Sequence, residues 1–271
     1  MYDDTIAHFT DLAARKLESL RRSPGAFVAG SLMAGAYVGL GILLIFSVGA
    51  PADPAYRKLI MGVSFGIALT LVVFAGSELF TGHNMYMMLG WLKRRCDGFD
   101  VALVWIVCWL GNLAGAAALA FIFVAGGGGG LLDDGGSLVY RVAESKMTAP
   151  VGELIARAIL CNWLVCLALW MSARMEGDAA KCIAIFWCLF AFIASGFEHS
   201  VANMTLFSVA LLGDPPANVN FIGMGYNLLW VTIGNIVGGG LFVGAGYWIA
   251  SGGRARAAAP AAEDHSEHGA P

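Results

Sequence analysis

Two stretches of the chain carry nearly the same motif: Gly76-Ser-Glu-Leu-Phe-Thr-Gly-His-Asn-Met85 and Gly196-Phe-Glu-His-Ser-Val-Ala-Asn-Met204. Both begin with Gly-x-Glu and end with Asn-Met, and each follows an apolar run long enough to lie in a membrane. A carboxylate or an imidazole at that depth is costly unless it faces a cavity or a partner. Polar, helix-breaking segments at matching places in two halves of a membrane protein indicate a binding site or pore near the bilayer midplane. The pattern therefore predicts a transport protein.

The composition places most of the chain in lipid. Of its 271 residues, 58% are hydrophobic and 13% are charged, and the mean hydropathy is +0.72. A soluble domain is charged at about a quarter of its positions. No basic stripe suggests a nucleic-acid partner. The six cysteines lack Cys-x-x-Cys spacing and clustered histidines, so we expect small buried side chains and neither a metal nor a cofactor.

The apolar runs predict six membrane spans, since one span needs about 20 apolar residues. The second and fifth runs are too long for one helix, and the Glu-containing motifs lie inside them. Each is predicted to be a helix, a non-helical break and a shorter helix, with the break satisfied by protein or trapped water. The six runs are 27–49, 59–91, 101–125, 151–172, 180–211 and 221–250.

Three regions follow from this pattern: an amphipathic helix on the cytoplasmic surface over residues 1–24, a channel domain over 25–250, and a disordered cytoplasmic tail over 251–271. With the N-terminus inside, eleven Lys and Arg lie on the cytoplasmic side and five on the other. This asymmetry favours a multi-pass protein of the cell (inner) membrane with both termini cytoplasmic.

The last spans of the two halves also match, because Gly111-Asn112 in one corresponds to Gly234-Asn235 in the other. Each half therefore has three spans, with the Glu motif before the Gly-Asn pair. Since three is odd, the second half enters the membrane from the opposite side. The repeats are predicted to be inverted.

The two Glu motifs, together with Cys161-Asn-Trp-Leu-Val-Cys-Leu-Ala168, resemble the formate/nitrite transporter family over essentially the whole chain. Residues 34–42, 82–85 and 191–196 are most similar to the nitrite channels of that family. The resemblance implies an all-α, aquaporin-like protomer of six transmembrane helices with helices 2 and 5 broken. It also implies a homopentamer with one anion pore per subunit.

Motif by motif, the resemblance assigns His199 to the centre of the pore and Thr81 to the flexible loop opposite it. It assigns Phe65, Leu69 and Phe192 to an outer constriction, and Leu79, Phe80 and Val165 to an inner one. Polar positions that support the pore are Asn162, Glu198, Asn203 and Asn235, and Lys146 lies in the outer vestibule. The formate channels have Ser or Thr after the loop threonine, where this chain has Gly82-His83. Their gating scheme therefore does not carry over directly.

The chemistry of His199 suits a weak-acid anion, because an imidazole can offer an N–H or a full positive charge. The alternative is a histidine satisfied within the core. We expect Glu198 and Glu78 to brace their breaks, since an exposed carboxylate would repel anions. Thr81 either satisfies open backbone or hydrogen-bonds the ring or the anion. His83 either lines the inner mouth or caps the following helix.

The resulting prediction is a membrane channel, not an enzyme, that moves nitrite and other small monovalent anions, with protons as possible co-substrates. A formate or hydrosulfide channel of the same family is the first alternative. A neutral-solute channel would carry Asn-Pro-Ala at the breaks, and a haem protein would need paired intramembrane histidines, whereas only His83 and His199 lie there. The run Gly126–Gly130 lacks the Gly-Lys-Ser/Thr that cradles phosphates, which disfavours ATP-driven pumping.

Overall fold

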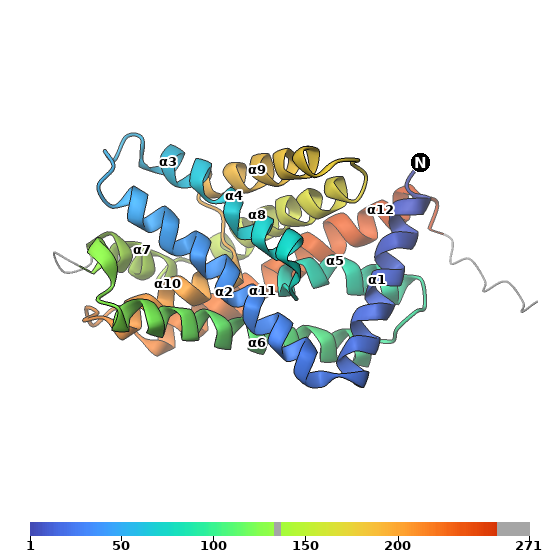
Figure 1. The fold of residues 1–271 in the computed structure, drawn as a ribbon, viewed down its shortest axis with the longest axis horizontal. Coiled ribbons are helices and arrows are strands. Elements are labelled where there is room, and N and C mark those ends of the chain that lie inside the picture. Colours follow the sequence, from blue (N-terminus) through green and yellow to red (C-terminus); the bar gives the residue numbers. More distant parts are fainter. Residues whose placement is uncertain (133–136, 254–271) are drawn as a thin grey trace, which may run out of the picture.

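The computed structural model describes residues 1–132 and 137–253, and this part of the chain is helical without a strand (Figure 1). Most elements are α-helices, η1 and η4 are π-helical, and η2 is a 3₁₀ turn. In chain order they are α1 (Asp3–Arg22), α2 (Pro24–Gly49), α3 (Arg57–Ser64), α4 (Gly66–Leu71), η1 (Val72–Gly76), α5 (Phe80–Leu92), α6 (Gly98–Ala125), η2 (Gly129–Leu131), α7 (Ser137–Met147), α8 (Val151–Ser172), α9 (Asp178–Ala194), α10 (Ser200–Leu212), α11 (Phe221–Ile236), η4 (Val237–Ala245) and α12 (Gly246–Ala250).

Five helical stretches in the described residues are long and apolar enough to cross a membrane. The run 180–211, predicted to be a helix, a break and a shorter helix, holds α9 with 17 residues and α10 with 13. From residue 254 onward, the predicted tail lies outside the described residues, as do residues 133–136 of the Gly-rich loop. The five stretches are Pro24–Gly49, Arg57–Gly76, Gly98–Ala125, Val151–Ser172 and Phe221–Ala250.

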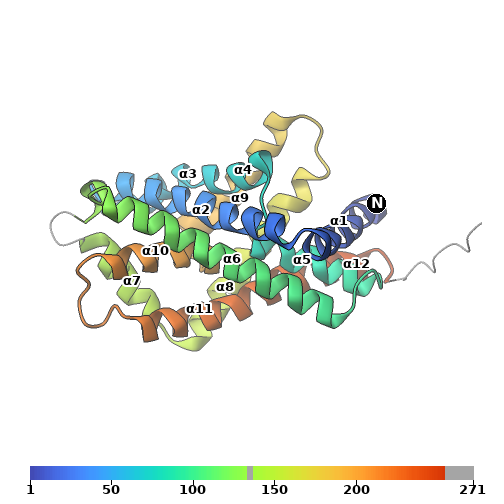
Figure 2. The ribbon, with the colours of Figure 1, turned by 60° about the horizontal axis from the view of Figure 1, so that its bottom comes forward.

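The long helices run side by side, and the short helices α5 and α10 lie towards opposite ends of the bundle (Figures 1 and 2). The N-terminus and α12 are at the end that holds α5, where α1 crosses the bundle. Helix α7 lies at the other end, beside α10.

The apolar face of α1 is covered by protein. Ile6, Phe9 and Ala13 are buried where α1 packs on α5 and α2. The Phe9 ring stacks on Tyr86 with 5.1 Å between centroids. The Arg21 guanidinium also donates to Asp100 Oδ1 at 2.6 Å, which ties α1 to the start of α6. The face that the sequence predicts for a membrane surface thus packs on other helices of the same chain.

Glycines let α2 and α6 cross in direct backbone contact. A Cβ at Gly35 would overlap the Asn112 carbonyl group, and a Cβ at Gly115 would overlap the carbonyl group of Leu32. Small residues at membrane helix crossings allow this approach, where dispersion replaces the missing hydrophobic drive between helices. The crossing also places Asn112 of α6 against the first break.

Replacing Gly115 with alanine is expected to lower the free energy of unfolding by about 1–3 kcal/mol, because the new methyl group forces two backbones apart. Gly25→Ala is the control, since a Cβ there meets nothing within 4 Å. Thermal unfolding of the detergent-solubilised protein should show a lower midpoint for Gly115→Ala alone. Equal midpoints for both variants would show that α2 and α6 are not held in this contact.

Candidate functional site

The two Glu motifs adopt the same backbone conformation. Gly76 and Gly196 have φ of +77° and +73°, the left-handed region that favours glycine. Three residues later, Leu79 (φ −100°, ψ 121°) and His199 (φ −115°, ψ 116°) are extended and immediately precede α5 and α10. The non-helical segments therefore span residues 77–79 and 195–199. The glycine of Gly-x-Glu is the residue that allows the chain to turn out of the preceding helix.

Asn112 satisfies the backbone of the first segment. Its Oδ1 accepts a hydrogen bond from the Phe80 amide at 2.9 Å. Its Nδ2 donates to the carbonyl groups of Ser31 and Glu78, both at 2.8 Å. Backbone groups that leave a helix inside a membrane need such partners. Asn112 is fully buried, so water does not supply them.

Asn235 makes the corresponding bonds at the second segment. Its Oδ1 accepts from the Ser200 amide at 2.9 Å, and its Nδ2 donates to the carbonyl groups of Ala158 at 2.9 Å and Glu198 at 3.0 Å. This side chain is also fully buried. Asn235 thus holds the backbone beside His199, which is a supporting position as the sequence predicts.

The carboxylate of Glu198 is buried and accepts two hydrogen bonds. Its Oε1 accepts from Lys146 Nζ at 2.8 Å, and its Oε2 accepts from Asn203 Nδ2 at 2.7 Å. Asn203 also donates to Asn227 Oδ1 at 2.9 Å. The three predicted residues Lys146, Glu198 and Asn203 therefore form one cluster. Glu198 braces the segment and does not present a free negative charge.

Glu78 has an equivalent cluster at the other end of the molecule. Its Oε1 accepts from Lys16 Nζ of α1 at 2.6 Å, and its Oε2 lies 2.9 Å from His83 Nε2. Each cluster has a lysine from outside the motif and a partner five residues after the glutamate. Sequence reasoning left His83 without a firm role and did not consider Lys16 at the site. The shared Gly-x-Glu spacing is the signal that could have found both.

Replacing Lys146 with methionine is expected to cost about 3–5 kcal/mol of stability, because it leaves the Glu198 charge buried and uncompensated. The double variant Lys146→Met/Glu198→Gln should recover much of this loss, because the neutral amide no longer needs a cation. Thermal unfolding of both variants measures the difference. A double variant no more stable than Lys146→Met would contradict the pairing.

His199 is held by both ring nitrogens. Its Nδ1 accepts the Ala202 amide at 3.1 Å, so a neutral ring carries its proton on Nε2. Nε2 lies 3.2 Å from Thr81 Oγ1, so the Nε2–H donates to that hydroxyl. Thr81 belongs to the first motif and His199 to the second. The two motifs therefore meet at this hydrogen bond.

Asn162 of α8 connects the two segments from the side. Its Nδ2 lies 3.1 Å from the carbonyl oxygen of Thr81, 2.7 Å from that of Asn235 and 3.0 Å from Asn84 Oδ1. The side chain is fully buried. Asn162 thereby fixes the position of Thr81 opposite His199.

A small cavity lies against the His199 ring. Its volume is about 10 Å³, room for about one water molecule. Five of the six apolar residues predicted as constrictions line it, and the rings of Phe65 and Phe192 meet edge to face at 5.6 Å. We call it the His199 cavity, and its lining consists of Val38, Phe65, Ala68, Leu69, Leu79, Val165, Leu189, Phe192 and His199.

Phe80 is the predicted constriction residue that the structure does not bring to this cavity. It lines a separate apolar groove of about 600 Å³ together with Trp105 of α6 and Leu228 of α11. The difference from Leu79 is local. Leu79 is extended, whereas Phe80 begins α5 and its amide bonds to Asn112. Adjacent side chains therefore point to different sides of the segment.

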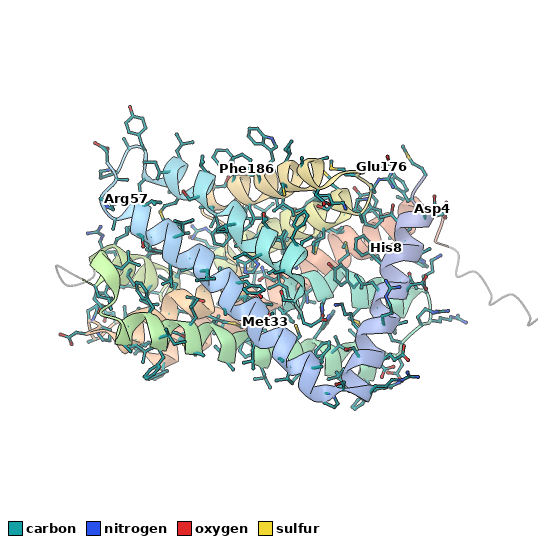
Figure 3. The ribbon with its side chains drawn as sticks, viewed as in Figure 1. Asp4, His8, Met33, Arg57, Glu176 and Phe186 are labelled. Carbon is teal, nitrogen blue, oxygen red and sulfur yellow. The ribbon has the colours of Figure 1, made fainter. Side chains whose placement is uncertain are left out.

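A second, more polar cavity of about 430 Å³ lies under α1. We call it the α1 vestibule. Lys16, His83, Ser77 and Lys181 line it, as does His8, which projects from α1 in Figure 3. Leu79 lines both this cavity and the His199 cavity. The Leu79 side chain is therefore the apolar boundary between the two.

These features define a multi-pass helical membrane protein with a polar centre between two interrupted helical regions. The sequence model of the family described as "Formate/nitrite transporter" matches residues 4–249, and the chain belongs to that family. It is 49% identical over 254 residues to the nitrite transporter NirC of Escherichia coli (strain K12), covering 93% of each chain.

Two solved structures are similar to this fold. One is described as an "FNT family ion channel", with a TM-score of 0.89, 50% identity, and coverage of 92% of this chain and 99% of the other. The second is described as a pentameric formate channel with formate bound. It has a TM-score of 0.71 and 29% identity, and the match covers 86% of this chain and 99% of that one.

Proposed function

We propose that the protein is a homopentameric channel that moves nitrite across the cell membrane, through a pore in each protomer that passes His199. The observation that carries this proposal is the Nε2–H of His199, which is aimed at Thr81 beside an apolar cavity between the two interrupted regions. The NirC relative supports nitrite as cargo. The pentameric formate channel supports the assembly.

The matched hydrogen bonds support two inverted three-helix repeats, with helices 2 and 5 broken in an aquaporin-like protomer. Asn112 and Asn235 make matching sets of three hydrogen bonds. Each accepts from the first amide of the helix after the segment, and each donates to the carbonyl group of the motif glutamate and to that of a neighbouring helix. Glu78 and Glu198 each bond a lysine from a preceding helix, α1 in one half and α7 in the other. In this view α5 and α10 are the second halves of the broken helices.

The mechanism follows from the lining of the His199 cavity. An anion loses water between Phe65, Leu69 and Phe192 on one side and Leu79 and Val165 on the other, which resists passive leakage. The Nε2–H of His199 then turns from Thr81 Oγ1 to the anion and replaces one lost hydrogen bond to water. Nitrite and formate are conjugate bases of weak acids, so they can also cross as neutral acids. Chloride has no such option.

The hydrogen bond that His199 Nδ1 accepts determines whether the ring acts as a neutral hydrogen-bond donor or as a charged proton donor. A doubly protonated ring would turn Nδ1 into a donor facing the Ala202 N–H, another donor. The charged ring therefore requires the start of α10 to rearrange. In the geometry described here, His199 acts as a neutral hydrogen-bond donor, and a proton step at this ring requires that local movement.

The orientation proposed from the positive charges puts the α1 end in the cytoplasm and Lys146 at the outer end. Residues 1–24 would then cover the inner mouth, residues 25–250 would form the channel, and residues 251–271 would form a cytoplasmic tail. Lys146 belongs to the last turn of α7, which lies at the opposite end from α1 (Figure 1), and there it neutralises the Glu198 carboxylate. No enzymatic role is proposed.

Currents through purified protein in planar bilayers test this function. We expect nitrite to carry the largest current and chloride the smallest, with formate and hydrosulfide between them. A chloride current equal to that of nitrite would contradict selection of weak-acid anions. A formate or hydrosulfide current above that of nitrite would assign the alternative cargo within the same family.

A further inference from the structure

The two glutamate clusters differ at one position. Glu198 is bonded to Lys146 and Asn203, and Glu78 is bonded to Lys16 and His83. An asparagine cannot gain or lose a proton near neutral pH, whereas a histidine can. The cluster under α1 therefore has a group that can change charge near neutral pH at the position where the other cluster has an asparagine.

Of the two ring nitrogens of His83, one makes a described hydrogen bond and the other does not. Its side chain is 2% exposed, and Nε2 faces the Glu78 carboxylate at 2.9 Å, so Nε2 carries a proton and donates it. Nδ1 is buried and has no hydrogen-bond partner among the described residues. In the neutral ring this nitrogen is a bare acceptor, and His83 lines the α1 vestibule beside Leu79. This nitrogen is itself covered, so a proton in the vestibule reaches it when the ring or its cover shifts.

The surroundings of His83 act on its charged form in opposite directions and attract an anion nearby. The Glu78 carboxylate faces the imidazole ring at 2.9 Å and stabilises its charged form, whereas burial of the ring and the charge of Lys16 disfavour that form. Lys16 and Lys181 place positive charge around the same cavity. The titratable and charged groups on the elements around His83 are Lys16 and His8 of α1, Glu78 of the first segment, Tyr86 of α5, Cys108 of α6, Cys166 of α8 and Lys181 of α9.

We propose that His83 is the proton acceptor of the α1 vestibule, which takes the proton of a small weak acid at Nδ1 and leaves its anion on that side of the pore. This inference rests on the proposed function. The O–H bond of the acid breaks, its electron pair stays on the oxygen, and the N–H bond forms at Nδ1. The imidazolium then releases its proton to water in the vestibule. In the opposite direction, the charged ring protonates an anion that arrives from the cytoplasm.

The test uses membrane vesicles of both orientations, from a host without its own nitrite transport. A tag at the N-terminus identifies the face that bears α1. Initial nitrite uptake is measured while the bath pH is varied between about 5.5 and 7.5, the range over which histidine changes charge, with the lumen held constant. Uptake by vesicles without the protein is subtracted. The variants are His83→Asn, which copies the Asn203 cluster, and His83→Gln, which keeps an N–H for Glu78.

His8→Asn is the matched control, because His8 lines the same vestibule from the exposed side of α1. Burial lowers the pKa of His8 and nearby Arg15 lowers it further, while Asp11 raises it. A dependence of nitrite uptake on the bath pH could also come from His8. It would disappear in His8→Asn and persist in the two His83 variants.

With the α1 face in the bath, we expect the wild type to take up nitrite several-fold faster at the acidic end of the range. The ratio of the two rates should fall towards one in His83→Asn and His83→Gln and stay at the wild-type value in His8→Asn. A wild-type ratio in both His83 variants, or a ratio lost in His8→Asn, would overturn the proposal. Wild-type vesicles with no uptake above the empty ones would instead refute the proposed function.

Discussion

Replacing His199 with phenylalanine is expected to lower nitrite flux by roughly 10- to 100-fold. The phenyl ring keeps the apolar volume beside Phe192 but removes the N–H that donates to Thr81 next to the cavity. A hydrogen bond to a charged group contributes about 1.5–3 kcal/mol, which corresponds to this range of rates when it is lost at the barrier. Nitrite influx into liposomes with purified protein, followed by stopped flow, measures the effect.

His199→Asn is the informative control for that variant. Asparagine is a good N-cap residue, so it can still accept the Ala202 amide and start α10, but its amide group does not extend as far as an imidazole ring. We expect it to fold as well as the wild type and still lose most of the flux. If both variants conduct nitrite at the wild-type rate, the ring does not contact the anion.

Replacing Asn235 with leucine is expected to have the largest effect on stability. The change leaves the amide of Ser200 and the carbonyl groups of Ala158 and Glu198 buried without partners. Each such group costs about 1–3 kcal/mol, so the loss totals roughly 3–9 kcal/mol. We expect little assembled protein after purification, and the rest should unfold well below the wild-type temperature.

Asn218→Ala controls for the loss of an asparagine as such. Asn218 is exposed and bonds only Glu144, at 2.9 Å, among the contacts described for it. Its removal should change the free energy of unfolding by less than about 0.5 kcal/mol, as is usual at surface positions. Fluorescence-detected size exclusion after heating compares the two variants. Similar profiles for Asn235→Leu and Asn218→Ala would show that Asn235 does not hold the second segment.

The class and family of this protein could be predicted from the sequence, and both predictions are confirmed. Long apolar runs leave few choices other than membrane helices, and the Glu-His-Ser-Val-Ala-Asn-Met stretch is specific to the family. The sequence also shows a glycine at the start of each motif. Its positive φ explains why the same residue type opens both segments.

Side-chain direction could not be predicted at the same level. Phe80 follows Leu79 directly, yet Leu79 lines the His199 cavity and Phe80 lines the groove beside α6. The backbone changes from extended to helical between them, and no periodicity applies across such a junction. For the same reason, the sequence pattern did not identify which residue would hydrogen-bond to the Glu78 carboxylate.

Contacts between segments that are far apart in the sequence could not be predicted from a local pattern either. Lys16 belongs to α1 and lies 62 positions before Glu78, and Lys146 lies 52 positions before Glu198. Lys146 was predicted through the family resemblance, whereas Lys16 was counted only among the cytoplasmic charges. Pairings of this kind depend on how α1 and α7 lie across the two ends of the bundle, which no local pattern encodes.

The central claim is that a small weak-acid anion crosses the membrane beside His199. Nitrite influx into liposomes that contain only the purified protein, driven by the nitrite gradient without ATP, tests it most directly. We predict influx well above that of empty liposomes, and most of the difference should disappear in His199→Phe. Influx equal to that of empty liposomes, or a difference untouched by His199→Phe, would contradict the claim.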